Sequence, residues 1–200
     1  KMFKKIFLAL FISSVSFLNA QETATSILSF PNPLEYDEAE FYLTQSKQRS
    51  KTLFQEQYIP KDENLRDFTQ LLDFSFFNKE IEIELAVRQK VESVQQREKK
   101  DKFAKVNVTE SPDGKEFIVD YFISEAPENG DSYIEYNIYR FKNMENGGQK
   151  SFLIMSYAKR MYGDLKSATK ALAKQRDHLM TTMIEYKIPK IKIAESTPGK

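Results

Sequence analysis

The stretch KVNVTESPDGKEFIVDYFIS, residues 105–124, decides the fold class. Apolar and polar residues alternate on both sides of Ser111-Pro112-Asp113-Gly114, which has the chemistry of a tight turn. Alternation with period two is typical of half-buried β-strands. The stretch therefore predicts a β-hairpin with strands over 105–110 and 115–124.

Two more strand patterns follow the hairpin, over 132–142 and 150–158, each after a short loop that contains glycine. Consecutive strands with short links favour an antiparallel meander. In 132–142 both faces of the strand carry apolar side chains. One face holds Ile134, Tyr136 and Ile138, and the other holds Tyr133, Tyr139 and Phe141. We therefore expect both faces of the sheet to be covered.

Upstream of the hairpin the pattern predicts three further strands, over 41–47, 52–59 and 70–77. The last of these is dense in Leu and Phe, which is typical of a strand buried on both faces. Between the second and third strands, Asp62-Glu63-Asn64 is expected to cap a short helix that ends at Phe68.

Two long helices are predicted around these strands. The first runs over 79–102 with Asn78 as its N-cap. The start of this segment also alternates with period two, as a strand would. The length of the segment and its many Gln, Glu and Lys residues favour a helix. The second follows Asp164 and ends before Pro189. It carries one apolar stripe, formed by Leu165, Ala168, Leu172, Leu179, Met183 and Tyr186. The sequence thus predicts an α+β fold, a central antiparallel sheet flanked by two long amphipathic helices.

Residues 1–20 have the pattern of a signal peptide. A basic start, KMFKK, precedes the apolar run 6–18, and cleavage is expected after about Ala20. The apolar run is shorter than the roughly 20 residues that span a bilayer. We therefore expect a periplasmic or secreted protein with no stable transmembrane segment after cleavage. Residues 21–40 are predicted as an extended N-terminal segment, 41–187 as a single domain and 188–200 as a loose C-terminal tail.

Composition excludes several classes of function. Three of the 30 Lys and Arg residues lie in the predicted signal peptide, so 27 basic residues face 29 acidic ones in the rest of the chain. A nucleic-acid-binding protein would need a basic stripe, so no nucleic-acid partner is expected. The chain has no cysteine. Thiol catalysis and zinc sites with Cys ligands are therefore excluded.

No residue pattern predicts a catalytic, cofactor-binding or metal site. His178 is the single histidine and is expected to be a partly exposed helix residue. Carboxylates are scattered, although the fold could still assemble a pair. The candidate binding surface is the end of the last strand, where Tyr157, Lys159, Arg160 and Tyr162 precede a helix. The alternative interpretation is that these side chains close the edge of the sheet.

Part of the chain resembles a group of uncharacterised exported bacterial proteins with the Mog1/PsbP-like fold. The resemblance begins at YIPKDENLRDFTQL, residues 58–71, where a charged turn leads into an aromatic–Thr–x–Leu strand entry. It continues through a helix, a strand meander, the aromatic–Ala–Lys–Arg segment 157–160 and a closing helix. The resemblance implies a central antiparallel sheet with helices on its faces, and it implies no activity, cofactor or site residue.

Three hypotheses for function remain open. The first is a non-enzymatic accessory or binding protein of the bacterial cell envelope, with an envelope protein or small ligand as partner. The second is an envelope-polymer hydrolase, which requires a carboxylate pair in a cleft. The third is a carrier of a small apolar ligand, which requires a closed apolar cavity between sheet and helix.

Overall fold

The computed structural model describes residues 24–194. The predicted signal peptide, residues 1–20, lies outside these described residues. Eight strands form one antiparallel sheet in the order β1-β2-β3-β4-β8-β7-β6-β5. The first four are β1 Leu34–Tyr36, β2 Ala39–Gln48, β3 Leu53–Pro60 and β4 Gln70–Phe77. The last four are β5 Lys105–Glu110, β6 Glu116–Glu125, β7 Tyr133–Asn146 and β8 Gln149–Tyr162.

The sheet consists of two meanders that meet at β4 and β8. Within each meander, neighbouring strands pair in sequence order, as expected for 105–158. The join is antiparallel and pairs β4 with β8 from Gln70↔Lys159 to Phe77↔Phe152. This contact links segments that lie far apart in the chain, and it creates one continuous surface from two local units.

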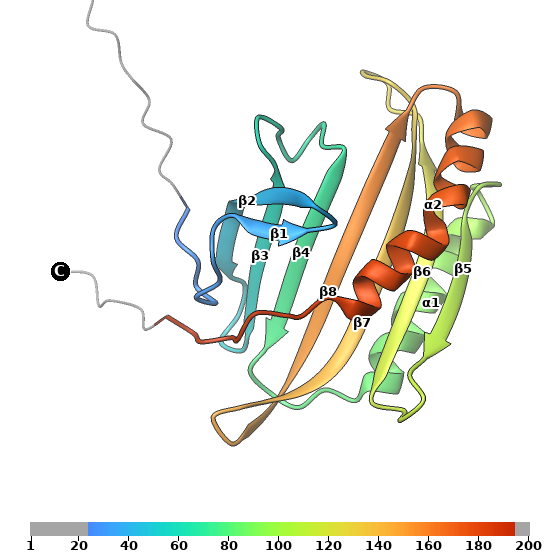
Figure 1. Cartoon of the computed structure of the whole chain (residues 1–200). Helices are drawn as coiled ribbons and strands as arrows, with labels where there is room; N and C mark the ends of the chain where they lie inside the picture. Colours follow the sequence, from blue (N-terminus) through green and yellow to red (C-terminus); the bar gives the residue numbers. More distant parts are fainter. Residues whose placement is uncertain (1–23, 195–200) are drawn as a thin grey trace, which may run out of the picture.

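The two helices lie on opposite faces of the sheet, α1 (Ile83–Glu98) behind it and α2 (Leu165–Glu185) in front of it in Figure 1. Helix α1 contacts β5, β6 and β7, and α2 contacts β7 and β8. The predicted α+β fold with two flanking helices is confirmed. Asp164 is the N-cap of helix α2, and its side chain accepts a hydrogen bond from the backbone N–H of Ser167.

Each face of the sheet has its own apolar core. On the α1 face, Val87 and Val94 of the helix pack with Val119, Phe141 and Phe152 of the sheet. The larger core lies on the α2 face. It includes Leu172, Leu179 and Met183 of α2 with Tyr58, Phe74, Ile138 and Tyr157 of the strands. The two-sided pattern predicted for 132–142 is therefore confirmed.

Two local predictions are wrong. Residues 62–68 form turns and bends and no helix. The reason is that Asn64 Oδ1 accepts hydrogen bonds from the backbone N–H groups of Arg66 and Asp67, which closes a tight turn. Helix α1 begins at Ile83 after Glu82, and Asn78 is not its N-cap. The backbone N–H of Asn78 donates instead to the Thr52 carbonyl, which holds the chain along β3.

The C-terminal end of the described chain also differs from the prediction. The sequence predicts a loose tail over 188–200, but residues 188–194 lie against the N-terminal segment. The backbone N–H groups of Lys192 and Ala194 donate to the carbonyls of Leu28 and Ile27, and Ile191 is buried. The two described ends leave the same side of the molecule (Figure 1). Together they cover the α2 face over β2, β3 and β4, where α2 does not reach.

Among residues 24–194, no helix is both long and apolar enough to cross a membrane.

Candidate functional site

The open part of the α1 face forms a groove of about 510 Å³. Its floor consists of β3, β4, β8 and β7, its side is α1 at Lys90, and the loop before β4 closes one end with Leu65 and Phe68. The groove exists because α1 covers only the β5 half of its face. On the opposite face, the terminal segments complete the cover that α2 begins. The groove is therefore the part of the sheet that the helix leaves open to solvent on the α1 face.

The strand pattern makes the groove floor polar. In the middle of β3 and β4 the burial alternates with the face of the sheet. The residues that point to the α2 face there are buried: Phe54, Glu56, Tyr58, Leu72, Phe74 and Phe76. Their neighbours Gln55, Gln57, Asp73 and Ser75 point to the groove and are half-buried. The groove-facing polar residues of the floor are Gln55, Gln57, Asp73, Ser75, Glu135, Asn137 and Ser156. Buried polar groups need hydrogen-bond partners. This polar floor therefore differs from an apolar core that merely lacks its cover.

Asp73 lies at the centre of the floor and accepts three hydrogen bonds. Gln55 Nε2 lies 2.7 Å and Gln57 Nε2 2.9 Å from Asp73 Oδ2, and Ser75 Oγ lies 3.1 Å from Oδ1. Burial raises the pKa of the Asp73 carboxyl, and the three hydrogen bonds, with nearby Arg49, oppose that rise. The groove thus holds a carboxylate whose charge is stabilised by neutral donors.

A second polar cluster lies at the end of the groove near Phe68. Arg160 Nε lies 2.6 Å from Glu135 Oε2, and Asn137 Nδ2 donates to Glu135 Oε1 over 3.0 Å. The Arg160 guanidinium also lies over the rings of Phe68, at 3.7 Å, and Tyr133, at 4.3 Å. Such contacts fix a guanidinium in one orientation. The charge of Arg160 is therefore neutralised within the protein.

Lys90 of α1 supplies a positive charge at the side of the groove. Its Nζ lies 3.9 Å from the centroid of the Tyr139 ring. Tyr139 pairs with Ser156, and Ser156 pairs with Asp73. Tyr139, over which Lys90 lies, and Asp73 are thus separated by roughly two strand spacings, about 10 Å. Besides the Arg160–Glu135 ion pair, the groove carries one charge of each sign, on Lys90 and Asp73, that takes part in no ion pair within the described residues.

The structure divides the four residues of the predicted binding surface between the two faces. Arg160 lines the groove, and Tyr162 donates its hydroxyl to the Phe68 carbonyl beside it. Tyr157 is buried in the α2-face core, and Lys159 Nζ donates to Gln175 of α2. Alternation along β8 causes this division, because successive side chains point to opposite faces. The sequence pattern did not single out Gln57, Asp73 and Asn137, because they lie on strands far apart in the chain.

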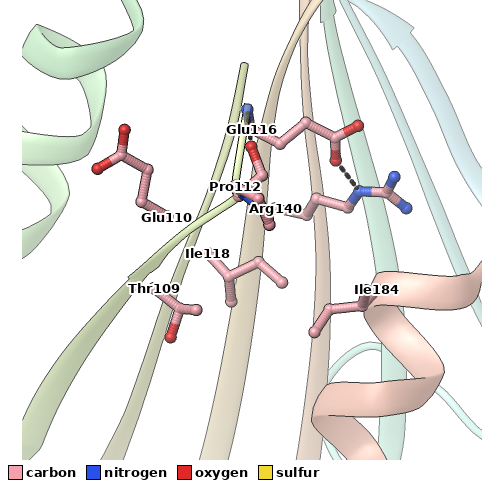
Figure 2. A pocket seen from close by; sticks show the side chains of 8 residues that line it. Thr109, Glu110, Pro112, Glu116, Ile118, Arg140 and Ile184 are labelled. Carbon is pink, nitrogen blue, oxygen red and sulfur yellow. Dashed lines mark hydrogen bonds and ion pairs between the residues drawn. The ribbon is translucent and has the colours of Figure 1, made fainter. Parts of the chain in front are cut away.

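A second, smaller hollow lies between the β5–β6 hairpin and the end of α2 (Figure 2). It measures about 190 Å³ and is lined mainly by apolar atoms of Ile118, Pro112 and Ile184. The ion pair between Arg140 and Glu116 forms its inner wall. Arg140 NH1 also donates to the carbonyls of Met183 and Tyr186 at the end of α2. These contacts give Arg140 a structural role, because they join the sheet to the end of α2.

The described residues offer no acid–base pair for hydrolysis in the groove. Its two carboxylates, Asp73 and Glu135, lie two strands and four residues apart, roughly 16 Å between Cα atoms. Glycosidase carboxyl groups are about 5–9.5 Å apart. Within residues 24–194, no group of three or more His, Cys, Asp or Glu side chains is placed to hold a metal ion. His178 is exposed, as predicted, and its Nε2 lies 2.6 Å from Asp37 Oδ1.

Comparison with known proteins gives one match. A protein-family model matches residues 28–188. The chain belongs to that family. The matched region includes every strand and helix described above and therefore the whole groove. No curated protein and no solved structure matches the chain significantly.

The buried carboxylate makes a testable prediction for stability. Asp73→Asn is expected to raise the free energy of unfolding at pH 7, because the amide oxygen still accepts from Gln55 and Gln57 and no charge is buried. The raised pKa means that the folded protein binds this proton more tightly than the unfolded chain. The advantage of the variant is therefore largest at pH 7 and shrinks as pH falls toward 4.

Urea denaturation of both proteins at pH 7 and pH 4 measures this difference. Asp131→Asn serves as the matched control, because Asp131 is exposed in the loop before β7. An Asp73→Asn advantage that grows with acidity would contradict the expected sign of the pH dependence.

Proposed function

We propose that this chain is a non-catalytic binding protein of the bacterial cell envelope that holds a polar ligand in the groove. The observation that carries the proposal is the polar floor: about 510 Å³ of open space over side chains already fixed by hydrogen bonds. Binding sites of roughly 300–1,000 Å³ with a few convergent polar groups are the usual size for small ligands. Fixed side chains also lower the entropy cost of binding.

Export to the envelope is part of the same proposal. It rests on the basic and apolar pattern of residues 1–20. The resemblance to exported proteins with the Mog1/PsbP-like fold agrees with this location. The two-helix, single-sheet architecture is compatible with that fold, and we propose it as the wider relationship of the family.

The two alternatives have weaker support. A hydrolase would need its carboxylates within reach of one bond, whereas the Cα atoms of Asp73 and Glu135 lie roughly 16 Å apart. A carrier of an apolar ligand would need an enclosed apolar cavity. The apolar hollow beside Ile184 is open and measures about 190 Å³, which is below the usual size for a ligand pocket.

Filling the groove tests the proposed site. Ser156 lies in the middle of the floor, and its hydroxyl has no hydrogen-bond partner among the described residues. Ser156→Leu is therefore expected to weaken binding of a groove ligand at least tenfold without breaking a side-chain hydrogen bond there. Saturation-transfer NMR with a library of peptidoglycan fragments, oligosaccharides and short peptides identifies ligands, and titration gives their affinities. Retained affinity in Ser156→Leu would contradict the groove as the binding site.

The matched control fills the other hollow. Thr109 is exposed on β5 and lines the space beside Ile184, so Thr109→Leu adds apolar volume there. We expect this variant to bind as the unchanged protein does. Loss of binding in Thr109→Leu alone would instead favour the carrier of an apolar ligand.

A further inference from the structure

The orientation of the groove amides is fixed by the carboxylates beside them. An ionised carboxylate can only accept hydrogen bonds, so the NH₂ groups of Gln57 and Asn137 must face Asp73 and Glu135. The carbonyl oxygens of the two amides point elsewhere. Neither Gln57 Oε1 nor Asn137 Oδ1 has a hydrogen-bond partner among the described residues, and neither is sealed from solvent. Each amide therefore keeps a free acceptor oxygen, beside the second N–H of its NH₂ group.

Asp73 and Ser156 provide further unused hydrogen-bond acceptors in the floor of the groove. Asp73 receives only neutral donors, and its Oδ1 accepts a single bond, from Ser75. Ser156 stands between Asp73 and Tyr139 in the strand register, and its hydroxyl is unpaired within residues 24–194. A serine hydroxyl can accept or donate. The centre of the groove thus combines several free acceptors with one negative charge, that of Asp73, which takes part in no ion pair within residues 24–194.

The unpaired negative charge of Asp73 favours a group that donates hydrogen bonds and carries positive charge. A protonated primary amine has three N–H donors and no acceptor. Hydrogen bonds from a charged donor to a carboxylate are about twice as strong as neutral ones. An acceptor-only group, such as a carboxylate or phosphate, would leave these oxygens unpaired and face the charge of Asp73 directly.

On the basis of the proposed function, we propose that the groove ligand carries a protonated primary amine and that its ammonium group binds at Asp73, between Gln57 Oε1 and Ser156 Oγ. The other charges agree with this position. Arg160 is neutralised by Glu135, and Lys90 lies over Tyr139 at the other side of the floor, where it repels a second cation. The amine can belong to a peptide or to an amino sugar.

Matched pairs of probes that differ only in the amine test the proposal. We would titrate trialanine against N-acetyl-trialanine, and the glucosamine tetramer against its fully N-acetylated form, by calorimetry at pH 6.5 and low salt. In at least one pair the free amine is expected to bind at least tenfold more tightly than the acetylated form. The pair that shows the difference identifies the source of the amine.

Variants then assign the effect to Asp73. Asp73→Asn keeps the hydrogen bonds from the glutamines but loses the charge, so the preference for the free amine is expected to fall below threefold. Asp131→Asn, the exposed control, is expected to keep the full preference.

The outcomes separate this proposal from the proposed function. Equal affinity within both pairs, or tighter binding of the acetylated forms, would overturn the amine site. If no probe binds but a library ligand binds and is lost in Ser156→Leu, the amine site is wrong and the groove function stands. If neither the probes nor the library bind, both proposals fail.

Discussion

Glu56→Ala is expected to lower the free energy of unfolding by about 3 kcal/mol or more and to release the N-terminal segment from the sheet. Glu56 is fully buried and accepts four hydrogen bonds. The donors are the Leu28 N–H at 3.1 Å, Ser26 Oγ at 3.1 Å, Ser46 Oγ at 3.0 Å and Tyr58 OH at 2.6 Å. Alanine removes the acceptor for all four and leaves a cavity. The buried Leu28 N–H then has no partner, which alone costs about 1–3 kcal/mol.

Glu56→Gln is the matched variant. Its amide oxygen can still accept from Leu28 and Ser46, while its NH₂ group faces the hydroxyls of Ser26 and Tyr58, which can turn to accept. We therefore expect a much smaller loss. Urea denaturation measures the stability, and hydrogen exchange at the Leu28 amide reports release of the segment. Unchanged exchange at Leu28 in Glu56→Ala would show that other contacts hold the segment.

The hairpin and meander could be predicted because their determinants are local. The Ser111–Gly114 turn and the alternation beside it specify strands within a short stretch of chain, and the structure contains them almost as predicted. The start of α1 was less well predicted. Residues 79–82 fit both helical and extended patterns. Long-range contacts, such as the Glu80–Lys150 ion pair, accompany the irregular, non-helical form observed there.

The groove could not be predicted from the sequence for a topological reason. Its floor depends on the pairing of β4 with β8, which places Asp73 beside Ser156. No local pattern encodes that pairing, because the two positions lie far apart in the chain. A sequence signal was nevertheless present: Gln55, Gln57 and Asp73 are polar at every second position of strands whose other face, apart from Glu56 and Gln70, is apolar or aromatic. Such a pattern indicates a strand face without apolar cover.

Arg176→Ala is expected to destabilise the protein by about 3 kcal/mol, because it leaves a buried charge without a partner. Asp120 of β6 is fully buried on the α2 face. Arg176 of α2 binds it through two bonds, Nε to Oδ2 at 2.8 Å and NH2 to Oδ1 at 2.9 Å, and the Tyr136 hydroxyl adds a third at 3.0 Å. Arg176 is one-third exposed, so we expect the low end of the range for a broken buried pair.

The double variant Asp120→Asn/Arg176→Leu separates the charge from the packing. It removes both charges, keeps an acceptor for Tyr136 and retains apolar contact with the sheet, so we expect it to recover much of the stability lost in Arg176→Ala. Lys150→Ala, which breaks an ion pair between exposed side chains, is the control and is expected to cause almost no change. Thermal and urea denaturation measure the stability of Arg176→Ala, the double variant and Lys150→Ala. A double variant as unstable as Arg176→Ala would mean that the guanidinium stabilises α2 by packing and not by neutralising Asp120, because the double variant no longer buries an unpaired charge.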